Sequence, residues 1–142
     1  MHREDWLLLV LNSAKGHELT PIQLQKSLFL LGQMVPQVSE GDFYNFYPYS
    51  YGPFDPTIYF DAEKLEEKGL IGINLGTNRW REYFITSEGS KYSRKLKKQI
   101  DEDIIEYIEK IVSLVRSLPF RKLVKLIYRH FPEYKANSIF QE

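Results

Sequence analysis

The chain has 142 residues, of which 43% are hydrophobic and 27% are charged, and this is the composition of one ordinary globular domain with a core of its own. It contains no cysteine, which excludes disulfides, thiolate metal sites and cysteine nucleophiles and fits a reducing cytoplasm. The formal net charge is zero, with 5 Lys and Arg against 10 Asp and Glu in residues 1–70 and 14 against 9 in residues 71–142. Such a chain is not a strong general binder of nucleic acid.

Two helices are expected at the start of the chain. Residues 4–14 carry Trp6, Leu7, Val10 and Leu11 on one stripe, and this spacing predicts a short amphipathic helix. Thr20-Pro21 then forms a strong helix start, because threonine is a good N-cap and proline is tolerated at the first helical position. The second helix is predicted to run to about residue 35. Apolar residues surround most of it, so we expect it to be central and buried.

An aromatic run follows, in which seven of the twelve residues 43–54 are Phe or Tyr. Its first part, residues 43–47, has the pattern of a strand. Pro48 and Gly52-Pro53 are expected to break any regular continuation, because proline lacks the N–H that a strand donates. A third helix is predicted from Pro56 to Lys68, with Gly69 as a left-handed C-terminal cap.

The remaining elements are a hairpin and more helices. Residues 70–75 and 80–86 alternate around a turn at residues 76–78, which predicts two antiparallel strands. Residues 100–118 carry isoleucines at helical spacing, and a last helix begins at Pro119. We therefore expect an α+β, mostly α, winged helix with a β-hairpin wing and two extra C-terminal helices. It would be a single domain over residues 1–142, with core and wing in 1–89 and C-terminal helices in 90–142.

One resemblance supports the winged-helix fold. Residues 65–71 read LEEKGLI, and the hairpin after them ends in Thr86-Ser87-Glu88-Gly89. Over about 25 residues this pattern resembles the helix end and wing of MarR-type and related winged-helix regulators. The resemblance implies the fold but not the ligand, because many winged helices bind protein rather than DNA.

A second resemblance is spread over most of the chain. Residues 24–30 (LQKSLFL) and 51–54 (YGPF) resemble the LQKLLYL and YGP motifs of the Panacea (SocA-like antitoxin) proteins and their small bacterial relatives, and residues 131–138 resemble the YPEY and NS ending of some relatives. Family members neutralise toxins by contact or have no assigned role. The resemblance therefore implies a toxin-neutralising or adaptor function. This sequence differs from the pattern by a second aromatic–proline pair, Tyr47-Pro48.

The aromatic run has two interpretations. Its rings could close the core, or Tyr47, Tyr49, Tyr51 and Phe54 could form a partner-binding surface on a loop that the prolines hold rigid. Because neighbouring side chains of an extended segment point in opposite directions, we expect Phe43 and some of the tyrosines to be buried and the other rings to be exposed. The core role is the safer interpretation.

A nucleic-acid interface is the alternative site. Arg79 and Arg81 lie near the hairpin tip, where a wing can reach a minor groove or phosphates. Basic residues continue after the hairpin, namely Lys91, Arg94, Lys95 and Lys98. They could equally be the solvated face of a helix. The third helix has a net charge of −2 from residue 57 to residue 68 and so opposes entry into a major groove.

Catalysis has little support in the sequence. The three histidines have no metal-ligand spacing, and neither a phosphate-binding glycine loop nor a nucleophile motif is present. We expect no enzyme activity, no cofactor and no metal. The expected partner is a protein such as a toxin, with DNA as the alternative. No membrane contact is expected, because the apolar run at residues 6–11 is too short to span a bilayer. A homodimer through residues 100–118 stays open.

Overall fold

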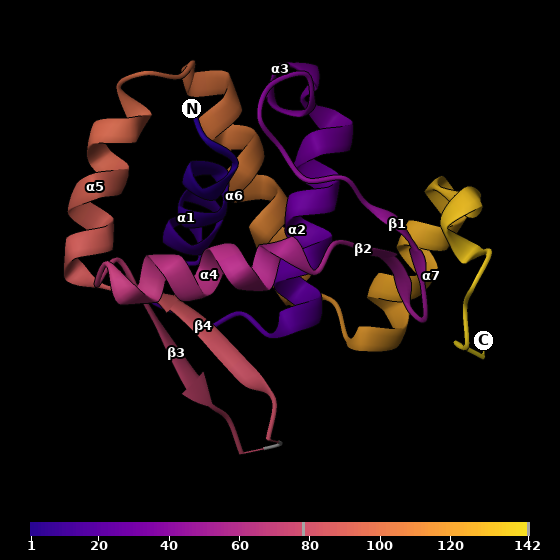
Figure 1. Cartoon of the computed structure of the whole chain (residues 1–142). Helices are drawn as coiled ribbons and strands as arrows, with labels where there is room; N and C mark the ends of the chain where they lie inside the picture. The colour runs from indigo at the N-terminus through magenta and orange to yellow at the C-terminus, as the bar shows by residue number, and fades with distance from the viewer. Residues whose placement is uncertain (78, 142) are drawn as a thin grey trace.

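The computed structural model describes residues 1–77 and 79–141 and is mostly helical, with two antiparallel two-stranded hairpins (Figure 1). This agrees with the predicted α+β, mostly α class. The elements in chain order are α1 (Arg3–Ser13), α2 (Pro21–Met34), α3 (Pro36–Ser39), β1 (Tyr47–Tyr49), β2 (Gly52–Phe54), α4 (Thr57–Glu67), β3 (Ile71–Leu75), β4 (Arg81–Ile85), α5 (Ser87–Lys97), α6 (Glu102–Ser117), α7 (Phe120–His130) and the 3-10 helix η1 (Pro132–Lys135).

Helices α1 and α2 form the centre of the core. The start of α2 is as predicted, because the Thr20 hydroxyl accepts a hydrogen bond from the Gln23 N–H at 3.3 Å and the Gln23 side chain accepts one from the Thr20 N–H at 2.9 Å. Residues 24–31 are all buried, which confirms the central position. The apolar stripe predicted for α1 is too narrow, since residues 5–11 are all buried. The reason is that α2, α4, α5, α6 and β4 surround this helix.

The predicted hairpin of β3 and β4 is confirmed, with Ile71 opposite Ile85 and Leu75 opposite Arg81. It projects away from the helical body (Figure 1). Leu19, between α1 and α2, pairs with Tyr83 of β4 through hydrogen bonds of 2.8 Å and 2.9 Å. This bridge ties the base of the hairpin to the central helices.

The turn from β4 into α5 depends on a close backbone approach. The Thr86 hydroxyl accepts a hydrogen bond from the Gly89 N–H at 3.0 Å and donates one to the Gly69 carbonyl at 2.7 Å. A Cβ at Gly89 would overlap the Leu70 carbonyl oxygen. Packing therefore explains why a glycine stands three residues after Thr86, since any larger residue at position 89 would meet the Leu70 backbone.

The aromatic run differs from its prediction. Residues 43–46 form no strand, and the strands lie further on, at β1 and β2, with Pro48 directly opposite Pro53. Pairs in an antiparallel ladder alternate between hydrogen-bonded and non-hydrogen-bonded, so two facing prolines can share a position where neither N–H is needed. The expectation that these prolines break regular structure is therefore wrong. Phe43 and Tyr44 are buried in the core.

Three α-helices follow the β3–β4 hairpin, one more than the two predicted. Helix α5 ends at Lys97 and α6 begins at Glu102, after Asp101 in an extended conformation. The break between them lets both helices pack against α1, and α6 also packs against α2. Ile104, Ile108 and Ile111 of α6 are buried. The C-terminal helices are thus part of the same core and not an addition to it.

Candidate functional site

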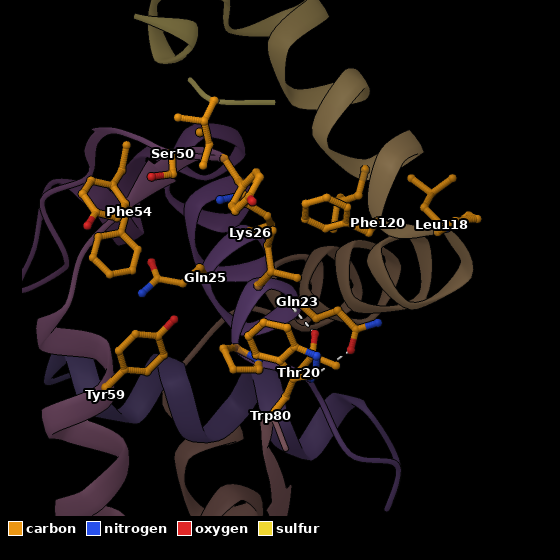
Figure 2. Close-up of a pocket in the computed structure, with 18 residues that line it drawn as sticks. Thr20, Gln23, Gln25, Lys26, Ser50, Phe54, Tyr59, Trp80, Leu118 and Phe120 are labelled. Atoms are coloured by element: carbon orange, nitrogen blue, oxygen red, sulfur yellow. Dashed lines mark hydrogen bonds between the residues drawn. The ribbon is translucent and has the colours of Figure 1, made fainter. Parts of the chain in front are cut away.

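A pocket of about 750 Å³ lies between the β1–β2 hairpin, the first half of α2 and the start of α7 (Figure 2). Its volume is within the range of small-molecule sites in proteins. In Figure 2, Phe54 and Tyr59 stand on one side and Phe120 and Leu118 on the other, with Lys26 between them. Trp80, from the tip of the β3–β4 hairpin, closes the lower rim beside Thr20. Four segments that are distant in sequence therefore meet here.

The four aromatic residues predicted to bind a partner lie together on the β1–β2 hairpin, and we call them the aromatic face. Tyr47, Tyr49 and Tyr51 are 43%, 49% and 40% exposed, and Phe54 is partly buried. The Tyr49 ring stacks on Phe54 at 4.8 Å between centroids, and Tyr47 contacts both rings edge-on at about 6 Å. Tyr51 turns the other way and meets Phe120 at 5.1 Å. The run is thus divided between core and surface, as its alternation predicts.

Two side chains of α2 fix the backbone of this hairpin, and sequence reasoning did not identify either. The Gln25 amide donates to the Asp55 carbonyl at 2.9 Å and accepts from the Asp55 N–H at 3.0 Å. The Lys26 ammonium donates to the Pro53 carbonyl at 2.9 Å. A sequence signal was present, because polar Gln25, Lys26 and Ser27 interrupt an otherwise apolar helix. Such residues in a buried helix need partners inside the protein.

Lys26 is unusual in its environment. Its side chain is buried, with 3% exposure of the residue, and no carboxylate in residues 1–77 or 79–141 forms an ion pair with it. Burial lowers the pKa of the ammonium from 10.5 to about 7, since a low-dielectric site disfavours the charged form. Burial likewise raises the pKa of the nearby Tyr59 hydroxyl to about 12. Tyr59 is therefore neutral at physiological pH, whereas the pKa of Lys26 lies close to that pH.

The residues predicted to bind nucleic acid do not form one patch. Arg79 lies at the hairpin tip, and Arg81 pairs with Glu63 of α4, with Nη1 and Oε1 at 3.1 Å. The other basic residues are all exposed, namely Lys91, Arg94 and Lys95 of α5 and Lys98 directly after it. The hairpin and α5 extend in opposite directions from their junction (Figure 1). The basic stretch of the sequence is therefore split in space.

Helix α4 is acidic on its outer side, as the sequence indicates. Asp61, however, faces inward and is buried, where it accepts hydrogen bonds from Arg3 Nε at 2.8 Å and from the Tyr44 hydroxyl at 2.7 Å. Glu66 and Glu67 are exposed. With Asp61 turned inward, the exposed carboxylates of residues 57–68 outnumber the exposed lysines by three to two, so the outer surface of α4 keeps only a weak negative charge against a DNA groove.

The apolar stripe of residues 100–118 is used within the chain, since α6 buries it against α1 and α2. The outer side of α6 carries the exposed Tyr107 and Leu114, which line a second, shallower groove of about 390 Å³ with α2 and α7. A dimer through this helix would have to use these outer residues and not the stripe.

Among the residues that the structure describes, no three His, Asp or Glu side chains are grouped so that they could hold a metal ion. Within the same ranges, no helix has the length and hydropathy needed to cross a bilayer. No protein-family model matches the sequence, and no curated protein is significantly similar to it.

Proposed function

We propose that this chain is a non-enzymatic module that binds a partner protein through the aromatic face. The observation that carries the proposal is the exposure of Tyr47 and Tyr49 side by side on one hairpin, with ring centroids 6.0 Å apart, together with the exposed Tyr51 at the turn of the same hairpin. Large rings are costly to leave in water, and tyrosine is enriched at protein interfaces because it buries much area with little loss of side-chain entropy.

The rigidity of the hairpin supports the same function. Three hydrogen bonds of the Gln25 and Lys26 side chains, two donated and one accepted, hold β2 and the residue after it on α2. On the other side, the Ile139 N–H donates to the Ser50 carbonyl at 2.9 Å. A surface whose backbone is already fixed loses little conformational entropy on binding.

The proposed architecture is a winged helix, in which α4 and the β3–β4 hairpin follow α1 and α2. The Leu19–Tyr83 bridge supports it by adding a third short extended segment to the wing. The likeness of residues 24–30 and 51–54 to the motifs of Panacea antitoxins supports a toxin as the partner, with an adaptor role as the other form of protein contact. Both motifs contribute to the site, since Lys26 and Gly52 line the pocket.

The test is capture of the partner by a tagged protein from its native host, with two double variants compared. Tyr47→Ala plus Tyr49→Ala removes two rings of the aromatic face. Tyr92→Ala plus Tyr107→Ala is the matched control, because these tyrosines are 42% and 43% exposed on α5 and α6, away from the hairpin. We expect the first variant to reduce capture at least about tenfold and the control to leave it unchanged. Equal capture by both variants would refute the proposal.

Duplex DNA is the second candidate, favoured by the exposed basic side chains of α5. It predicts binding that falls steeply with salt, and loss of binding in Arg94→Ala plus Lys95→Ala. A gel shift without retardation of genomic fragments at low salt would remove this candidate. We rank DNA binding below protein contact, because the outer side of α4 is acidic and Arg81 already forms an ion pair with Glu63.

A further inference from the structure

The Lys26 ammonium has more donors than the protein satisfies. An ammonium carries three N–H donors, and the Pro53 carbonyl accepts from one of them at 2.9 Å. No other hydrogen bond from Lys26 is formed within the described ranges. Lys26 is also one of the residues that line the pocket, so this group lies at the pocket wall although only 3% of the residue is exposed.

The pocket has no anion of its own. Its lining contains no Asp or Glu, and Lys26 is the one Lys, Arg or His residue in it, among the parts of the chain that the structure describes. Asp55 is close in sequence to the hairpin, but its carboxylate already accepts from the Asn45 N–H at 2.8 Å and from the N–H and hydroxyl of Thr57 at 2.9 Å and 2.7 Å. This carboxylate is therefore engaged elsewhere.

A purely structural clamp does not need a cation at this position. Gln25, one residue earlier, makes two hydrogen bonds to the Asp55 backbone with a neutral amide. Burying a lysine costs free energy that burying a glutamine does not, unless an anion accompanies it. The ammonium thus fits a site that is completed by something from outside the chain.

We propose that this pocket binds a small organic acid, with one carboxylate on the Lys26 ammonium and an apolar body between the aromatic walls. A single cation matches a single carboxylate. The walls are largely apolar, with Phe54 on one side, Leu118 and Phe120 on the other and Trp80 at the lower rim. Leu123 also lines the pocket. Apolar lining with a few fixed polar groups is the usual design of a small-molecule site.

The inference goes beyond protein contact and does not depend on it. Tyr47 belongs to the aromatic face but does not line the pocket. Tyr47→Ala is therefore expected to weaken partner capture while leaving acid binding unchanged, which separates the two proposals.

The experiment compares acids with their neutral isosteres. Phenylacetate, 2-naphthoate and octanoate are titrated into the full chain, each beside its primary amide, and binding is followed by NMR chemical shifts of the hairpin amides. Lys26→Met removes the cation at similar volume. Lys64→Met is the matched control, because Lys64 is an exposed lysine of α4. Ile22→Trp keeps the cation and fills the pocket from the first turn of α2.

We expect at least one acid to bind with a Kd below about 1 mM and its amide to bind at least about tenfold more weakly. Lys26→Met and Ile22→Trp should each lose the binding, and Lys64→Met should keep it. The proposal is overturned if no acid of the panel binds, if the amide binds as tightly as the acid, or if both pocket variants bind normally. If Lys26→Met fails to fold, the comparison of acid with amide and the Ile22→Trp variant still decide the question.

Discussion

The free energy of unfolding should rise with pH above neutrality because of Lys26. The unfolded chain keeps a proton on this lysine up to its ordinary pKa of 10.5, whereas the folded chain releases it near a pKa of about 7. Between these values the unfolded state binds more protons, so stability increases with pH. From about pH 7 to pH 9 the increase amounts to about 2 kcal/mol, which is on the order of 7 °C in Tm for a chain of this length.

The tyrosines whose pKa is shifted do not change the stability between about pH 7 and pH 9. Burial raises the pKa of four tyrosines above the ordinary value of 10.0, namely Tyr44, Tyr59, Tyr83 and Tyr134. A tyrosine that ionises less readily in the folded state reduces stability only as the pH rises above its unfolded pKa. The stability gained between about pH 7 and pH 9 is therefore assigned to Lys26.

Urea denaturation across this pH range provides the assay, with m-values compared to exclude a change of the unfolded state. Lys26→Met should abolish the rise, because it has no group to titrate, and Lys64→Met should preserve it. The reasoning is refuted if the wild type shows no rise, or if Lys26→Met shows the same rise as the wild type.

Variants at three further residues test the packing by the same denaturation assay. Arg3→Met should lower the free energy of unfolding by about 3 kcal/mol, because it leaves the buried Asp61 carboxylate without its cation. A decrease below about 1 kcal/mol would show that water already screens this pair. Gly89→Ala should cost about 2 kcal/mol, since its Cβ would overlap the Leu70 carbonyl oxygen, and an unchanged midpoint would contradict that close approach. Thr20→Ala should cost about 1 kcal/mol through the loss of the α2 cap, whereas Thr20→Ser should cost little.

Much of the fold could be predicted because it is determined locally. The Thr20-Pro21 helix start and the glycine cap after α4 each depend on a few adjacent residues, and Gly69 has the left-handed φ of +77° that the cap requires. The β3–β4 hairpin likewise follows from alternation around a turn. These signals need no knowledge of what packs against them.

The β1–β2 hairpin could not be predicted by the same reasoning, because it depends on tertiary contacts. Its strands have three residues each and contain prolines, which local rules place outside sheets. Hydrogen bonds from Gln25 and Lys26 fix it, and those residues are more than twenty positions away. The break after Lys97 has a similar origin, since it allows two helices to pack on α1.

The candidate site was predictable only in part. The aromatic face is evident from composition, since a dense aromatic run is a clear signal whether the rings are inside or outside. The pocket could not be predicted from the sequence, because its walls come from α2, α7 and both hairpins. Lys26 gave a signal as a charged residue inside an apolar helix, but only the fold shows that this residue lines a cavity.

Photo-crosslinking from the aromatic face inside the native host tests the central claim most directly. A photoreactive phenylalanine analogue would replace Tyr49 in one strain and Tyr92 in another, since both tyrosines are exposed to a similar degree. We predict a specific protein adduct from position 49 that excess wild-type protein competes away, and no such adduct from position 92. The same adducts from both positions, or none from position 49, would contradict binding of a partner protein through the aromatic face.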